Sequence, residues 1–160
     1  MNPTVSILIP TYNRHEILVD TLKGVLQQTY RPLEIVVYDQ TESHPESVIQ
    51  FLNENSASIR WERGNAQGLV NAYARCAELA TGDFFLFLDD DVFIDDPQLV
   101  NKHIATLTKP QVGAVMGKIE HENQLEFSDI DPRIHHKNGW QFVRFDYNSP
   151  VENMPSLAAA

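Results

Sequence analysis

The sequence predicts an α/β fold in which a mainly parallel sheet is flanked by helices. Over the first 120 residues, short apolar runs rich in β-branched residues alternate with stretches of helical periodicity, at intervals of roughly 25 residues. One run, residues 84–88, is apolar at every position, which is typical of a central strand covered on both faces. Because parallel strands need crossover connections, this alternation favours right-handed βαβ units.

The first strand is expected at Val5–Ile9, where Pro10 would end it because proline cannot donate to a ladder. A helix follows, since apolar residues recur on one face between Ile17 and Leu26. Asn13, with Glu16 three residues later, resembles a capping box at the start of this helix. The turn at 10–14 therefore opens a helix at the carboxyl end of a strand.

The same cycle recurs along the chain. Further strands are expected at 34–38, 59–61, 84–88 and 112–119, and further helices at 45–55, 69–80 and 97–107. Gly82 is placed to end the third helix in the left-handed conformation. Pro97 is expected as the first residue of the fourth, capped by Asp95 or Asp96.

The alternation of strands and helices is lost near Glu120. In the remainder, Asn138-Gly139 suits a two-residue turn between strands at 133–137 and 140–145. We therefore divide the chain into a core at 1–120 and an irregular tail with a short β-hairpin at 121–160.

Length and composition favour one ordinary soluble domain. The chain has 160 residues, 42% of them hydrophobic, and is long enough to bury a core. Its 12 basic and 22 acidic side chains give a formal charge of −10, which disfavours a nucleic-acid partner or an acidic membrane surface. The single cysteine, Cys76, excludes an intramolecular disulfide. No signal peptide is evident, and no stretch approaches the roughly 20 apolar residues of a membrane helix, so a cytoplasmic location is expected.

Asp89-Asp90-Asp91 is the feature of the sequence that points most directly to chemistry. Three adjacent carboxylates repel one another, and a divalent cation would relieve the repulsion because Mg²⁺ and Mn²⁺ prefer oxygen ligands. The alternative is an acidic turn that caps the following helix. The position favours the metal, since the three residues follow the most apolar strand and ligands bind at the carboxyl ends of parallel strands.

Three other features are expected at the same edge of the sheet. The turn Pro10–Arg14 offers backbone N–H groups, an aromatic ring and a guanidinium. Asp39 ends the second strand, where its carboxylate could accept a hydrogen bond from a nucleobase imide. Gly68 would permit close approach of a ligand at the start of the third helix, and Arg75 could meet an anion. The plainer alternatives are capped loops and solvent-exposed side chains.

In their order and spacing, these motifs resemble those of the family 2 glycosyltransferases, which have the GT-A fold. The resemblance covers residues 4 to about 118. It rests on the segments Val5–Arg14, Glu34–Thr41, Gly68–Arg75, Ala80–Asp83 and Phe87–Val92.

The resemblance implies a nucleotide-diphospho-sugar donor, UDP-linked, whose sugar moves with inversion to a hydroxyl of a saccharide or lipid-linked acceptor. Asp39 would hydrogen-bond uracil, Asp90 would approach the ribose or donor sugar, and Asp91 of the DxD motif would ligate Mn²⁺ or Mg²⁺ bridging the phosphates. The substrate-binding residues that it implies are Pro10, Thr11, Tyr12, Arg14, Asp39, Gly68, Arg75, Asp89 and Asp90.

The chain departs from the family pattern because no residue before Ala160 matches the later carboxylate that serves as general base. We therefore assign no catalytic base, and we expect 121–160 to be the start of a truncated acceptor region. Two alternatives stay open. One is a non-catalytic module that binds nucleotide sugars. The other is a sugar nucleotidyltransferase, which is disfavoured because Pro10–Arg14 contains no glycine.

Overall fold

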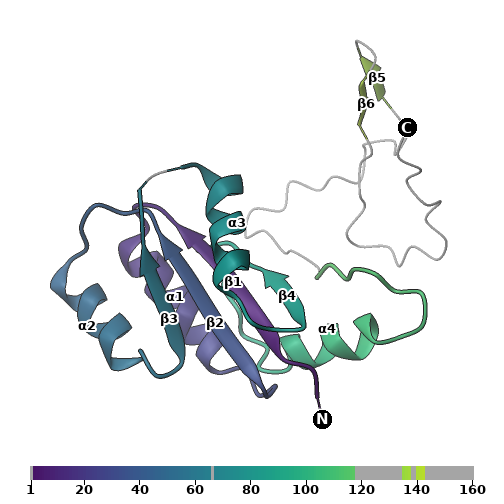
Figure 1. Ribbon diagram of the computed structural model, residues 1–160, viewed down its shortest axis with the longest axis horizontal. Helices are drawn as coiled ribbons and strands as arrows, with labels where there is room; N and C mark the ends of the chain where they lie inside the picture. Colours follow the sequence, from purple (N-terminus) through teal and green to yellow (C-terminus); the bar gives the residue numbers. More distant parts are fainter. Residues whose placement is uncertain (1, 66, 118–134, 138–139, 143–160) are drawn as a thin grey trace. The chain divides into compact units, whose positions relative to one another are not determined.

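Four apolar segments form the sheet that organises the first part of the chain (Figure 1). In this computed structural model, which describes residues 2–65, 67–117, 135–137 and 140–142, these strands are all parallel. They are β1 (Val5–Thr11), β2 (Leu33–Asp39), β3 (Ile59–Arg63) and β4 (Phe84–Phe87), in the spatial order β3-β2-β1-β4. The predicted α/β class is therefore confirmed.

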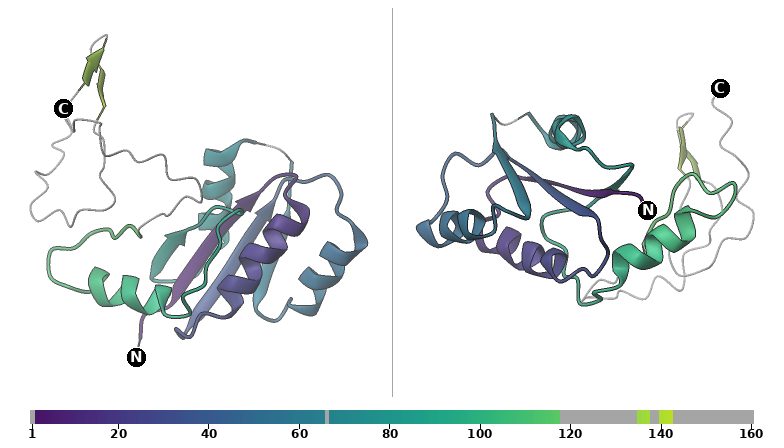
Figure 2. Two further views of the ribbon diagram at one scale, coloured as in Figure 1. Left: turned by 180° about the vertical axis from the view of Figure 1, so that it is seen from behind. Right: turned by 60° about the horizontal axis from the view of Figure 1, so that its bottom comes forward.

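Three helices connect these strands, namely α1 (His15–Leu26), α2 (Glu46–Glu54) and α3 (Leu69–Leu79), and α4 (Leu99–Leu107) follows β4. α1 and α2 lie on one face of the sheet and α3 on the other (Figure 2). The alternation of side chains along β1 serves both faces, because Ile7 and Ile9 pack with α1 whereas Leu8 packs with Ala72 and Cys76 of α3. No helix in the described residues is long and apolar enough to span a membrane.

Pro10 acts on the sheet differently from the prediction. β1 does not end before it but continues to Thr11 along β2, where Pro10 lies beside Tyr38. Pairing with β4 stops instead: Leu8 lies opposite Phe87, and Leu88 N donates to Leu8 O at 3.1 Å. The next bond of a parallel ladder would need an N–H at residue 10, which proline lacks. Pro10 therefore ends one of the two pairings of β1 and leaves the other intact.

β4 pairs only with β1 in the described chain, so the prediction of a central strand is wrong there. Phe84 and Leu86 pack against the core on the α1 side. Phe85 and Phe87 point the other way and are 43% and 58% exposed. α3 packs mainly on β1 and β2 and reaches this face of β4 through Tyr73, whose ring lies edge-on to Phe87 at 5.4 Å between centroids. A run that is apolar at every position therefore does not by itself indicate cover on both faces.

The predicted N-terminal helix caps are wrong. Arg14, not Asn13, occupies the N-cap of α1, without a side-chain hydrogen bond to the helix. Asn13 instead has a left-handed φ of 58°, and its backbone N–H donates to Thr41 Oγ1 at 2.8 Å. α4 begins two residues after Pro97, and Asp96 receives the amide of its N-cap Gln98 at 2.9 Å. A tertiary contact to Thr41 thus replaces the expected cap at Asn13, and a local turn at Asp96 replaces the expected cap of α4.

Gly82 serves a packing role rather than the predicted C-cap. α3 ends at Leu79, and its C-cap Ala80 is extended. A Cβ at Gly82 would lie 2.5 Å from Ser6 Oγ and 2.8 Å from Ser6 N. The glycine therefore allows the segment before β4 to approach the start of β1, and its amide donates to Ser6 Oγ at 2.9 Å.

The chain divides into two units, residues 1–112 and residues 113–160. The predicted strand at 112–119 is absent over 112–117, and its last two residues lie outside the described part. The predicted hairpin strands are present as β5 (His135–Lys137) and β6 (Trp140–Phe142), which pair antiparallel. Its expected turn at Asn138-Gly139 lies outside the described residues, and a boundary near Glu120 stays a prediction.

Candidate functional site

The carboxyl ends of three strands bring the predicted residues to one edge of the sheet. Thr11 ends β1 directly beside Asp39, which ends β2. β4 runs parallel to β1, and Leu88 leads from it into Asp89–Asp91. In open parallel sheets this edge is the one at which ligands bind.

Residues of α1 contact the backbone of the acidic turn, Asp89–Asp91, and of the segment that follows it. The Thr21 hydroxyl lies 2.9 Å from the carbonyl oxygen of Asp90 and 3.0 Å from that of Val92. One turn later, Gly24 packs so closely on the same segment that a Cβ there would lie 2.7 Å from Ile94 O. The backbone that carries the carboxylates is therefore anchored to a buried helix.

The three carboxylates have different partners. Tyr73 on α3 donates its hydroxyl to Asp89 Oδ1 at 2.8 Å. Arg14 Nη2 lies 3.3 Å from Asp91 Oδ2, and Arg14 Nε lies 3.9 Å from Asp90 Oδ1. One guanidinium thus faces two carboxylates, with a third beside them. This excess of negative charge favours a divalent cation.

The donor set suits a hard cation that is completed by substrate. Carboxylate oxygens are the ligands Mg²⁺ and Mn²⁺ prefer, and Asp91 is 48% exposed, so it can reach an ion at the surface. In the part of the chain that the structure describes, no three His, Cys, Asp or Glu side chains form a ready-made metal cage. An ion here would need further oxygen ligands, which the phosphates of a nucleotide could supply.

Asp90 is the most enclosed of the three, with a side chain 13% exposed. Burial raises its pKa above the usual 3.8, and the neighbouring Asp91 charge adds to the rise. The nearby Thr11 hydroxyl and the Arg14 guanidinium oppose it. A cation at this turn would favour the ionised carboxylate in the same way as Arg14.

The end of β1 presents one unsatisfied polar atom. Thr11 is 2% exposed, and its Oγ1 has no partner of hydrogen-bonding geometry in the described chain, although it lies near Asp90. Buried hydroxyls are usually paired, so an orphan at the ligand edge fits a contact completed by substrate. The next residue, Tyr12, is 55% exposed and offers a free aromatic face.

Asp39 lies within a buried polar network. Its side chain is fully buried and accepts hydrogen bonds from Thr41 N at 2.8 Å, Trp61 Nε1 at 2.9 Å and His44 Nε2 at 2.7 Å. His44 Nδ1 in turn lies 3.0 Å from His15 Nδ1. No local motif indicates these partners, since only the fold brings β3 and the loop after β2 to one carboxylate, and α1 to His44.

The remaining predicted residues are placed less centrally. Gly68 is the N-cap of α3 with φ of 82°, and no other atom would meet a Cβ there. Its conformation, not a close contact, calls for glycine. Arg75 pairs with Glu78 on the same helix, and its described partners do not include the acidic turn. Pro10 is buried within β1. Substrate contacts of these three residues stay predictions.

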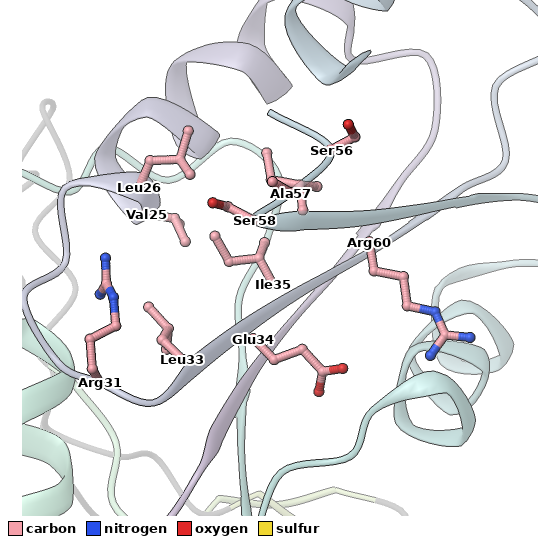
Figure 3. A pocket seen from close by; sticks show the side chains of 11 residues that line it. Val25, Leu26, Arg31, Leu33, Glu34, Ile35, Ser56, Ala57, Ser58 and Arg60 are labelled. Atoms are coloured by element: carbon pink, nitrogen blue, oxygen red, sulfur yellow. The ribbon is translucent and has the colours of Figure 1, made fainter. Parts of the chain in front are cut away.

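A groove in the described chain lies away from this edge. Its volume is about 450 Å³, and residues at the amino ends of β2 and β3 line it, together with the end of α1 (Figure 3). Arg31 and Arg60 flank it, but their guanidinium groups already donate to backbone carbonyls. This groove is at the opposite edge of the sheet from Asp39 and Asp91.

Comparison with solved structures identifies the architecture. A mannosyltransferase from Pyrobaculum calidifontis, solved with GDP-Man and Mn²⁺, superposes with a TM-score of 0.60 and 19% identity over 69% of this chain and 34% of its own. Staphylococcus aureus TarS 1-349 with UDP-GlcNAc gives 0.54 and 21%, over 65% and 31%. Both are GT-A glycosyltransferases, so the fold is GT-A.

Sequence comparison shows the family. A beta-1,3-glucosyltransferase of Campylobacter jejuni is 33% identical over 92 residues, which are 56% of this chain and 30% of that protein. The O-antigen biosynthesis protein RfbC of Myxococcus xanthus is 27% identical over 121 residues, 73% of this chain and 9% of its own. The chain thus spans less than a third of these relatives. The family model for Glycosyl transferase family 2 matches residues 6–155, and the chain belongs to this family.

Proposed function

We propose that this chain binds the nucleoside diphosphate part of a nucleotide sugar at the carboxyl edge of its sheet, as the donor-binding part of an inverting glycosyltransferase. The single observation that carries this proposal is the acidic turn Asp89–Asp91 facing Arg14, next to the unsatisfied Thr11 hydroxyl. Family membership supports transfer of a sugar from such a donor.

A divalent cation at Asp91 would join the protein to the diphosphate. Two phosphates would meet strong repulsion from three adjacent carboxylates in a chain of net charge −10. The ion, Mn²⁺ or Mg²⁺, would neutralise the phosphates and stabilise charge on the leaving oxygen. The Mn²⁺ in the P. calidifontis mannosyltransferase structure supports this assignment.

The described residues have separable tasks in this scheme. Arg14 would turn from Asp91 to the phosphates once the ion occupies the carboxylates, because a guanidinium binds phosphate as readily as carboxylate. The exposed Tyr12 ring would stack on the base, and Thr11 Oγ1 would take a hydrogen bond from or give one to the nucleoside. Asp90 would accept from a sugar hydroxyl.

The transfer itself follows from the chemistry of the donor. An acceptor hydroxyl of a saccharide or lipid-linked molecule attacks the anomeric carbon on the face opposite the diphosphate. The bond from the anomeric carbon to the phosphate oxygen breaks, the configuration inverts, and a general base takes the hydroxyl proton. We assign no residue as this base. The tail carries six carboxylates without a matching context, and all lie outside the described residues: Glu120, Glu122, Glu126, Asp129, Asp131 and Glu152.

The donor is expected to be UDP-linked, because Asp39 accepts hydrogen bonds and the imide of uracil donates one. The neighbours bind GDP-Man and UDP-GlcNAc, whose bases both carry a ring N–H. Cytosine and adenine present an acceptor at the corresponding ring position. The chain is therefore expected to prefer nucleotides of uracil or guanine to those of cytosine or adenine.

Calorimetry with Asp91→Asn tests the proposal. UDP should bind the wild-type chain at least tenfold more tightly in Mn²⁺ than in EDTA, and the substitution should remove most of this difference. Asp95→Asn is the matched control, since Asp95 is an exposed carboxylate of the same loop. Equal binding in Mn²⁺ and EDTA would refute the metal bridge.

A transfer assay separates the enzyme from a module that only binds donors. The wild-type chain is incubated with UDP-sugars, Mn²⁺ and saccharide acceptors, and product anomers are read by NMR. Inverted product at enzymatic rates supports the transferase. Binding with only slow hydrolysis of the donor supports the module.

A further inference from the structure

The Asp39 carboxylate has only one acceptor position left for a ligand. Oδ2 receives Trp61 Nε1 and His44 Nε2, and Oδ1 receives Thr41 N. A carboxylate offers about four lone-pair positions, so a single one, on Oδ1, is still open. Because Asp39 is fully buried, a base reaches this position only when the residues that cover it move.

His44 must carry its proton on Nε2 in order to donate to the ionised carboxylate. Its side chain is 1% exposed, so water does not replace this bond. The other ring nitrogen, Nδ1, faces His15 Nδ1 at 3.0 Å, a distance at which only one proton fits between them. When both rings are neutral, His15 supplies that proton and His44 accepts it.

The contact between the two Nδ1 atoms therefore fixes both tautomers: neutral His15 carries its proton on Nδ1, and neutral His44 carries its proton on Nε2. Arg63 of β3 lies nearby; it donates to Thr41 O and Glu42 O and lies over the Trp61 ring.

We propose that His44 is a positioning residue for nucleobase recognition. It occupies Asp39 Oδ2 together with Trp61 and leaves one Oδ1 position for a base that carries a ring N–H, while His15 fixes the tautomer of His44. The proposal rests on the proposed donor site and deepens it: the pocket selects uracil or guanine nucleotides over cytosine and adenine nucleotides.

Binding of four diphosphates in Mn²⁺ tests this assignment. In His44→Leu, the affinity for UDP and GDP should fall at least tenfold, whereas the weaker affinity for CDP and ADP should stay within about threefold. His44→Gln, whose amide can still donate to Asp39, should keep most of the preference. His103→Leu, a histidine on α4 bonded to Leu99 O, is the control and should match the wild type.

NMR of ¹⁵N-labelled histidine provides a second measurement that needs no nucleotide. It is made on the wild-type chain, so it tests the proposal even if His44→Leu fails to fold. We expect His44 to be protonated on Nε2, with one proton shared with His15. A His44 protonated on Nδ1 alone would overturn the proposal. The proposal would also be overturned if His44→Leu lost affinity equally for all four diphosphates, or if the wild-type chain showed no preference among them. Neither result would contradict the proposed donor site. Binding of no nucleoside diphosphate would overturn the donor site as well.

Discussion

Four carboxylates at one edge of the sheet have four different surroundings. Asp39 is fully buried among three donors, Asp90 is mostly buried with a raised pKa, Asp89 bonds to Tyr73, and Asp91 is half exposed beside Arg14. Asp91 can approach an ion without losing a buried partner, whereas Asp39 and Asp90 cannot move without disturbing buried contacts. The division of roles among identical groups therefore follows from burial.

Cys76 gives a test of the core at the level of one side chain. It is fully buried, and burial raises the pKa of its thiol to about 11. Because thiolate is the reactive form, the folded chain should react with an aromatic disulfide reagent at pH 8 more than about 100-fold slower than the chain in guanidinium. Stopped-flow labelling measures this ratio, and rapid labelling of the folded chain would contradict it.

Asp96 predicts a pH dependence of stability. The hydrogen bond from Lys102 and that from the Gln98 amide lower its pKa below the usual 3.8. The folded state favours the charged form, so the stabilisation is present above pH 3.8 and is lost as the pH falls through the lower folded value. The urea midpoint of Asp96→Asn should therefore lie below that of the wild type at pH 7. The gap should close towards pH 3, and Asp95→Asn should show no such change.

Among the elements, α1 contributes most to the site without touching a ligand. Its Thr21 hydroxyl and its Gly24 backbone both contact the segment that carries the acidic turn. A change inside this helix should therefore alter both stability and metal binding. A comparison of Gly24, where a Cβ has no room, with Gly113, where it has, tests this point.

Gly24→Ala should destabilise the chain. Overpacking against Ile94 typically costs about 1–3 kcal/mol, which exceeds the roughly 0.5–1 kcal/mol that alanine contributes inside a helix. Mn²⁺-dependent UDP binding should weaken too, because Ile94 follows the acidic turn. Gly113→Ala, where a Cβ meets nothing within 4 Å, should change neither urea unfolding nor binding. An unchanged midpoint for Gly24→Ala would show that the loop yields freely.

The sequence predicts the elements well and their ends poorly. Continuous apolar runs identify β1 and β2, which are buried on both faces, and helical periodicity identifies α1, which buries one face. Their ends depend on distant partners: the Asn13 amide bonds to Thr41, and Gly82 packs on Ser6. Such contacts join residues far apart in the chain, and local propensity contains no information about them.

The sequence predicts that the site residues lie at one edge of the sheet, but it does not predict the hydrogen bonds among them. Thr11, Asp39 and Asp89–Asp91 follow strands, so topology alone brings them together. His44 and Trp61 carry no motif; their one local indication is that a histidine follows Asp39 by five residues. The pairing of Asp39 with Trp61 needs the register of β2 on β3.

For the whole molecule, the net charge of −10 predicts an unusual salt dependence. In EDTA the chain and UDP repel each other, and raising the ionic strength from about 10 mM to about 150 mM shortens the Debye length from about 30 Å to about 8 Å. The affinity for UDP should therefore rise with salt when no divalent ion is present. Calorimetry at both ionic strengths measures it. An affinity that falls would show that Arg14, not the overall charge, dominates the encounter.

The missing amide hydrogen of Pro10 has a consequence for the energetics of ligand entry. β1 and β4 cannot pair beyond Leu8 and Leu88 in any state in which the sheet is folded. Their divergence is set by covalent structure and is therefore independent of nucleotide, metal, pH and salt. A ligand that arrives at Asp89–Asp91 meets strands that are already apart, and none of its binding energy is used to separate them. Between β1 and β4, the site is therefore preorganised because Pro10 lacks an amide hydrogen.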